Sequence, residues 1–126
     1  MHVNSAVSHM MKYERFQPQI DLNDPEKGFE FASDGDGVTL WFTDWRNRQV
    51  IFRFRMVYRF SHRLANGYAG LPEGEALEIP DSDVVASLRA DGTASENEEL
   101  HHYVISTNED EWCEAVAERI EIEEEG

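Results

Sequence analysis

The sequence predicts a mainly β fold, or α+β with one or two short helices, as an antiparallel meander packed against a second hairpin in a single domain. Apolar and polar residues alternate in several segments, which is typical of strands that bury one face. Short runs of Asp, Gly and Asn separate these segments and favour tight turns. A chain of 126 residues with 40% hydrophobic content is large enough to bury a core without disulfides or a structural metal.

The longest alternating segment, residues 49–63, organises this prediction. One of its faces carries only apolar and aromatic side chains, namely Val50, Phe52, Phe54, Met56, Tyr58 and Phe60. The opposite face mixes arginine with aliphatic residues, namely Ile51, Arg53, Arg55, Val57 and Arg59. No Gly or Pro interrupts the segment, so we expect one long amphipathic strand with a wholly apolar inner face.

The segments before it complete the meander. Residues 29–32 and 38–45 alternate in the same way, and the Asp/Gly sequence at 34–37 predicts the turn between them. Both faces of residues 38–45 carry apolar side chains or Thr, which favours a central strand. Residues 11–23 are predicted to be irregular, with room for a short edge strand, because Pro18 interrupts any helix.

Residues 61–74 form the longest irregular stretch, rich in Gly and Pro, and we expect a mobile or functional loop there. A short strand is predicted over 76–79. Asp81, Ser82 and Asp83 carry the signal of a helix N-cap, which predicts a short helix over 82–90, with a strand as the alternative.

The C-terminal part is predicted to be the second hairpin. Residues 100–107 alternate as a strand. Residues 112–122 fit both a helical stripe and a two-residue repeat, and Asn108 with Glu111 is close to a capping box. We favour the strand, because a short polar turn at 108–111 joins it to the preceding one.

Residues 1–10 show no periodicity and end in Ser-His-Met, so we expect a disordered arm or cloning remnant followed by one domain over 11–126. The lone Cys113 indicates a reducing setting. No stretch resembles a signal peptide or a membrane span. Together these features predict a cytoplasmic location and no membrane partner.

The net charge of −15 argues against nucleic acid as a ligand and favours a basic protein partner. Between residues 46 and 63 there are six arginines and no acid, so pairing of this stripe with acids elsewhere in the chain is expected. The acidic clusters are the candidate partner-binding residues: Glu96, Glu98, Glu99, Glu109, Asp110 and Glu111.

Candidates for chemistry are weak, and no catalytic residue, metal or cofactor is predicted. Asp34 and Asp36 lack the further ligands of a calcium loop. His101 and His102 would point to opposite faces of a strand and cannot chelate one metal. The acids around Cys113 raise rather than lower a thiol pKa. An alternative function is a small ligand-binding or enzymatic domain, with a pocket under the 61–74 loop lined by His62, Tyr68, Arg53 and Arg55.

The order of these segments carries a resemblance. A strand and an Asp/Gly turn precede Val-Thr-Leu-Trp-Phe-Thr-Asp-Trp at 38–45, and His-His-Tyr-Val-Ile-Ser-Thr at 101–107 precedes an acidic hairpin. This pattern resembles the small acidic β-rich immunity proteins of bacterial polymorphic or contact-dependent toxin systems. The resemblance implies a non-enzymatic inhibitor that neutralises a basic toxin or nuclease.

Two alternatives stand beside the resemblance. The protein is a phage-type inhibitor or DNA mimic of a nucleic-acid-binding protein, or two copies pair through a sheet edge as a homodimer.

Overall fold

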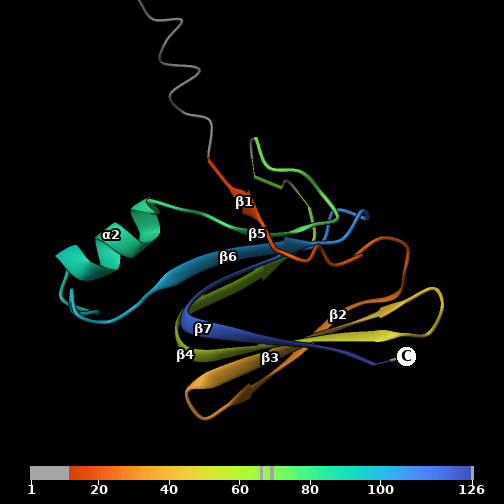
Figure 1. The fold of residues 1–126 in the computed structure, drawn as a ribbon, viewed down its shortest axis with the longest axis horizontal. Coiled ribbons are helices and arrows are strands. Elements are labelled where there is room, and N and C mark those ends of the chain that lie inside the picture. The colour runs from red at the N-terminus through yellow and green to blue at the C-terminus, as the bar shows by residue number, and fades with distance from the viewer. Residues whose placement is uncertain (1–11, 66, 69, 126) are drawn as a thin grey trace, which may run out of the picture.

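The two longest strands, β4 (Gln49–Arg63) and β7 (Trp112–Glu125), pair antiparallel along nearly their whole length and form the centre of the sheet. The computed structural model describes residues 12–65, 67–68 and 70–125 (Figure 1). The other strands are β1 (Glu14–Arg15), β2 (Pro25–Asp34), β3 (Gly37–Asp44), β5 (Ala76–Glu78) and β6 (His101–Ser106). The strand order is β1-β5-β6-β7-β4-β3-β2, with antiparallel neighbours throughout.

The predicted mainly β fold is confirmed. Strands β2, β3 and β4 form the meander, and β6 and β7 form the second hairpin, so the strand interpretation of residues 112–122 is correct. The meander and the hairpin meet edge to edge through β4 and β7 and therefore share one sheet. Helix α2 (Asp83–Ala90) begins as expected at Ser82, whose Oγ accepts a hydrogen bond from the backbone N–H of Val85 at 3.2 Å.

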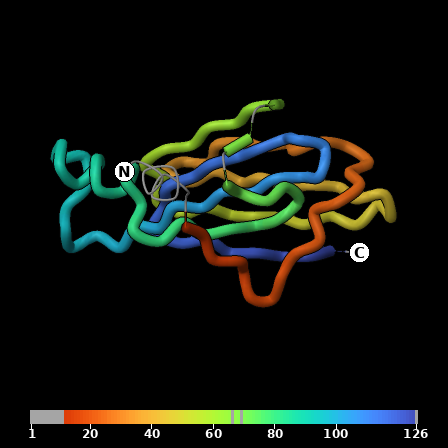
Figure 2. The backbone as a smooth tube through the Cα atoms, turned by 90° about the horizontal axis from the view of Figure 1, so that it is seen from above, coloured from red at the N-terminus to blue at the C-terminus, as the bar shows by residue number. Residues whose placement is uncertain are grey.

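The sheet is rolled around its main core, as the tube in Figure 2 shows. In pairing order β2 is an outer strand, yet the backbone N–H of Phe29 donates to Glu111 Oε1 at 2.9 Å. The backbone N–H of Asp24 likewise donates to Asn108 Oδ1 at 2.9 Å. The β2 side of the sheet therefore curls back until it meets the turn between β6 and β7, and the aromatic core lies inside this curve.

The expected continuous apolar face of residues 49–63 is interrupted at Met56 and Val57, although Phe60 packs against the core as expected. Met56 has a φ of 56° and is 38% exposed, whereas Val57 on the predicted outer face packs against the core. The register with β7 also shifts between Val57 and Arg59. A long strand pair must bend to follow a rolled sheet, and a bulge provides the bend by changing which side chains point inward.

A smaller core covers the outer face of β5, β6 and β7. It consists of Leu71, Leu77, Ile79, Val104 and Trp112, with Tyr13 and Tyr68 packed against it.

The predicted loop at 61–74 begins later than expected, because residues 61–63 still belong to β4. Within the described ranges, no helix is long and apolar enough to cross a membrane. The predicted arm at 1–10 lies outside the described residues.

Candidate functional site

The six predicted partner-binding acids do not form one cluster. Glu96, Glu98 and Glu99 follow α2, whereas Glu109, Asp110 and Glu111 lie in and after the β6–β7 turn. The six residues of β6 separate the two groups by about 20 Å at about 3.4 Å per residue (Figure 1). A partner would have to span this distance to contact both groups.

The exposure expected of Glu111 is wrong. Its side chain is buried, with Oε1 accepting the backbone N–H of Phe29 and Oε2 lying 2.6 Å from His62 Nε2. Asp110 is also engaged within the chain, because its Oδ1 accepts the indole N–H of Trp112 at 2.6 Å. Glu111 therefore holds the end of the β6–β7 turn against β2 and β4, whereas Asp110 bonds within the hairpin. The partner-binding role remains a prediction for the exposed acids of the two groups.

The residues of the alternative pocket are not brought together either. Arg55 pairs with Glu121 at 3.1 Å and Arg53 pairs with Glu123, which is the internal cross-strand pairing expected of the arginine stripe. His62 lies nine positions beyond Arg53 on β4, which corresponds to about 30 Å of strand. The pocket imagined from His62, Tyr68, Arg53 and Arg55 therefore does not exist as a unit.

The loop after β4 is seated on Trp112. The Tyr68 and Trp112 rings meet edge to face, with centroids 5.6 Å apart, and a Cβ at Gly67 would clash with the Trp112 indole. Leu71 is buried in the same cluster. The described side chains of this loop therefore pack closely on Trp112.

A buried polar chain that the sequence reasoning missed crosses the outer face of the sheet. Glu114 Oε2 lies 2.5 Å from His102 Nε2, and His102 Nδ1 lies 2.7 Å from Ser82 Oγ. The other carboxylate oxygen, Glu114 Oε1, accepts hydrogen bonds from Ser61 Oγ at 3.2 Å and from Tyr68 OH at 3.1 Å. His102 and Glu114 are both buried. Strand alternation could place each of them on a face, but only the register of β6 against β7 brings them together.

The pKa of Glu114 lies below its usual value, because the hydrogen bond from His102 favours the carboxylate and outweighs the opposing effect of burial. The pKa of Tyr68 is raised by burial and by the charge of Glu114. Because Ser82 Oγ accepts the Val85 N–H, its own proton is available to His102 Nδ1, and Nε2–H then donates to Glu114. This chain can hold a proton and polarise the Ser82 hydroxyl. Ser82 and His102 both border a groove of about 550 Å³ beside α2.

His101 lies on the opposite face from His102, as expected, between two carboxylates. Nδ1 lies 2.6 Å from Glu78 and Nε2 lies 2.6 Å from Glu99. Burial lowers the pKa of His101, but the hydrogen bonds with Glu99 and Glu78 more than compensate, so the pKa is raised above 6.5. The described residues contain no group of three or more side chains that could hold a metal ion.

The environment of His101 predicts a stability that depends on pH above pH 6.5. The folded-state pKa of His101 exceeds the unfolded value of 6.5, so its stabilising effect is complete below pH 6.5 and is lost as pH rises through the folded pKa. We expect the free energy of unfolding to fall as the pH rises over this window, and we expect a smaller fall in the H101Q variant. Urea unfolding at closely spaced pH values measures the free energy of unfolding as a function of pH. An unchanged slope in H101Q would contradict the assignment.

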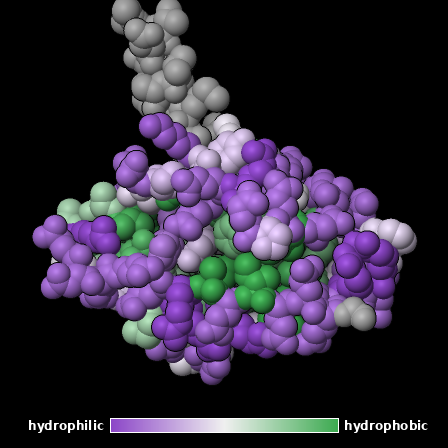
Figure 3. Space-filling model, viewed as in Figure 1, coloured by the Kyte–Doolittle hydropathy of each residue, from purple (hydrophilic) through white to green (hydrophobic). Residues whose placement is uncertain are grey.

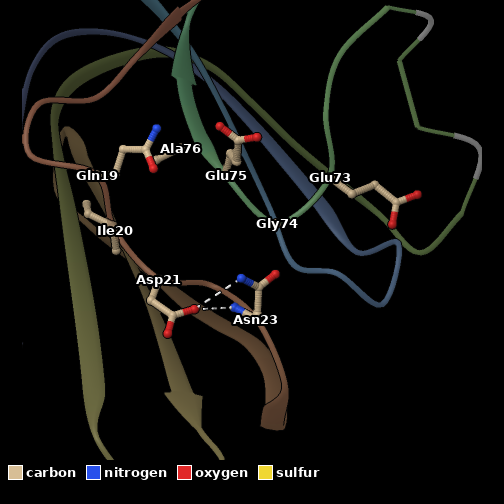
Figure 4. Close-up of a pocket in the computed structure, with 8 residues that line it drawn as sticks. All are labelled: Gln19, Ile20, Asp21, Asn23, Glu73, Gly74, Glu75 and Ala76. Carbon is tan, nitrogen blue, oxygen red and sulfur yellow. Dashed lines mark hydrogen bonds between the residues drawn. The ribbon is translucent and has the colours of Figure 1, made fainter.

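A second cavity, of about 460 Å³, lies between residues 19–23 and 73–76. In Figure 4 the Glu73 side chain points away from Asp21, whose Oδ1 accepts two hydrogen bonds from Asn23 at 3.1 and 3.2 Å. Asp21 also pairs with Arg46, and Glu75 pairs with Arg15. The carboxylates around this cavity are therefore used within the chain or point away from its centre.

Comparisons of the chain with protein-family models, curated proteins and solved structures return no match. The fold and the composition define a strongly acidic, mainly β domain built on one rolled antiparallel sheet.

Proposed function

We propose that this protein is a non-enzymatic binding protein that captures a basic protein, in the manner of an immunity-type inhibitor of a toxin or nuclease. One observation carries the proposal: more than half of the basic side chains pair with carboxylates of the same chain. Of the 11 basic residues, six arginines pair with carboxylates: Arg15, Arg46, Arg48, Arg53, Arg55 and Arg119.

Internal pairing leaves the excess of acidic groups to the surface. Asp44, for example, is buried and accepts the backbone N–H groups of Arg46 and Arg48 at 2.9 and 2.8 Å, and its Oδ2 pairs with both guanidinium groups. Exposed acids such as Glu96 and Glu109 make no ion pair within the described ranges. Such a surface attracts a cationic protein, speeds its association and repels nucleic acid.

The test is affinity capture from the lysate of the source cell, using immobilised chain and washes at low and high salt. We expect one basic protein to be retained at low salt and to be released at high salt, because screening weakens charge attraction. A variant carrying E96Q, E98Q and E109Q should retain less of the basic protein at low salt. Salt-independent capture, or no capture, would contradict the proposal. Displacement of the captured protein by duplex DNA would favour the DNA-mimic alternative.

A second candidate function, ester hydrolysis, is favoured by the Ser82–His102–Glu114 chain beside its groove. Ser82 Oγ would add to an ester carbonyl while its proton passes to His102 Nδ1 and then to the leaving alkoxide; water would release the acyl group by the reverse transfers. The first backbone N–H groups of α2 lie next to Ser82 and could face the developing oxyanion.

This second candidate is tested with a fluorophosphonate probe and with p-nitrophenyl acetate. Labelling and turnover that disappear in S82A but persist in S87A, a change at an exposed serine of the same helix, would support hydrolysis. Absence of labelling in the unaltered chain would reject it and would leave the polar chain with a structural role.

A further inference from the structure

The C-terminal half of β7 has an open backbone edge. Residues 119–125 pair with β4 on one side, whereas the pairing of β7 with β6 ends at the His101–Ala117 pair. No other strand within residues 12–65, 67–68 and 70–125 pairs with residues 118–125. In an antiparallel edge, every second residue directs its N–H and C=O away from its one neighbour, so this edge can accept another strand.

An apolar groove of about 430 Å³ runs beside this open edge. In Figure 2 the segment that follows β1 loops out beside the C-terminal half of β7. The apolar lining comes from this segment, β6 and β7: Phe16, Pro18, Ile20, Tyr103, Ile120 and Ile122. Ile122 is 40% exposed, and Figure 3 shows a hydrophobic area in the middle of one face of the molecule, surrounded by hydrophilic residues.

Carboxylates dominate the rim of the groove. Glu14, Glu78 and Glu124 line it, and the nearby cation, Arg15, is bonded to Glu75. Residues 118–125 contain five acids; Glu121 and Glu123 pair with Arg55 and Arg53 of β4, and the other three, Glu118, Glu124 and Glu125, still outnumber Arg119. The edge therefore combines free backbone groups, an apolar groove and a local excess of negative charge.

We propose that this edge receives an extended basic segment of the partner protein as an added strand, with an apolar side chain of that segment seated in the groove. Strand addition provides backbone hydrogen bonds, and alternate side chains provide specificity. The charge selects the occupant, because a second copy of this chain would place the same carboxylates against each other. The proposal rests on the proposed binding of a basic partner and assigns the place of contact.

The edge is tested on the full chain with a synthetic peptide in which lysine alternates with valine. The matched control is the same peptide with N-methyl groups on every second amide, which keeps the charge and removes backbone donors. We expect the methylated peptide to bind at least about tenfold more weakly, since it loses several backbone hydrogen bonds to the edge. Equal binding of the two peptides would overturn strand addition.

The groove is tested with I122Q. We expect about a tenfold loss of peptide affinity, whereas L64Q, the same kind of change at a side chain that is 71% exposed and outside the groove, should leave it unchanged. Backbone NMR spectra of each variant verify that the fold is retained. Equal affinity for I122Q and L64Q would overturn the groove as the site of the apolar contact.

Amide hydrogen exchange in the presence of the captured partner separates this inference from the proposed function. Protection of residues 118–125 supports both. A captured basic partner that protects 96–99 or 109–111 and leaves 118–125 unprotected would overturn the edge while the binding function stands. Peptide binding at the edge without any captured partner would contradict the proposed function and retain the edge as a strand-accepting site.

Discussion

Replacing Glu114 with alanine is expected to lower the free energy of unfolding by about 3 kcal/mol, because a hydrogen bond to a charged group contributes about 1.5–3 kcal/mol and the carboxylate accepts several. The variant leaves His102 Nε2, Tyr68 OH and Ser61 Oγ without the carboxylate that bonds all three. Of these groups, His102 is buried and cannot recover its hydrogen bond from water without opening the outer face of the sheet. Urea denaturation at pH 7, followed by circular dichroism, measures the change.

The control is E125A at an exposed position near the end of the same strand, for which we expect a change within about 0.5 kcal/mol. The pH dependence provides a second check. The folded-state pKa of Glu114 is depressed below 4.5, so its stabilising effect is present above pH 4.5 and is lost as pH falls through the folded pKa. The difference in the free energy of unfolding between the unaltered chain and the E114Q variant should therefore become smaller as the pH falls below 4.5. A loss in E114A as small as that in E125A would show that the polar chain contributes nothing to stability.

Replacing Trp112 with alanine is expected to cost about 3–5 kcal/mol, the range for removal of a large buried aromatic side chain. Trp112 is 2% exposed and contacts Tyr68 and Gly67 of the loop after β4, so its loss leaves a cavity and frees that loop. We expect faster amide exchange over residues 67–72 in addition to the lower free energy of unfolding.

W45A is the matched control, because Trp45 is 62% exposed and lies just after β3. The same chemical change there should cost about 1 kcal/mol or less and should leave exchange at 67–72 unchanged. Similar costs for W112A and W45A, or unchanged exchange at 67–72 in W112A, would contradict the packing of this loop on Trp112.

The strands and turns of this fold could be predicted because their determinants are local. Alternation of apolar residues reports which segments bury one face, and the Asp/Gly turn after β2 shows the expected geometry, with Gly35 at a φ of 62°. The start of α2 was predictable for the same reason, since the Ser82 cap lies within the helix's own first turn. The excess of arginine on one strand also predicted pairing with acids elsewhere in the chain, which Arg55 and Glu121 show, although the pairing of β4 with β7 was not predicted.

The candidate sites were predicted less well, because a site depends on residues that are far apart in the sequence. Glu111 looked like an exposed acid, and it became buried when the β2 side of the sheet curled onto the β6–β7 turn. His62 and Arg53 share a strand, and its length keeps them apart. The Ser82–His102–Glu114 chain exists because of the register between β6 and β7 and the position of α2.

By itself, then, the sequence determined the strands, their turns, the helix cap and the excess of negative charge, since each follows from neighbouring residues or from composition. The tertiary structure alone decided the bend of β4 at Met56, the burial of Glu111 and Glu114, and the open edge of β7 beside its apolar groove. The physical reason is that sheet roll and strand register are set by packing over the whole core, and a shift of one residue in register moves a side chain to the other face.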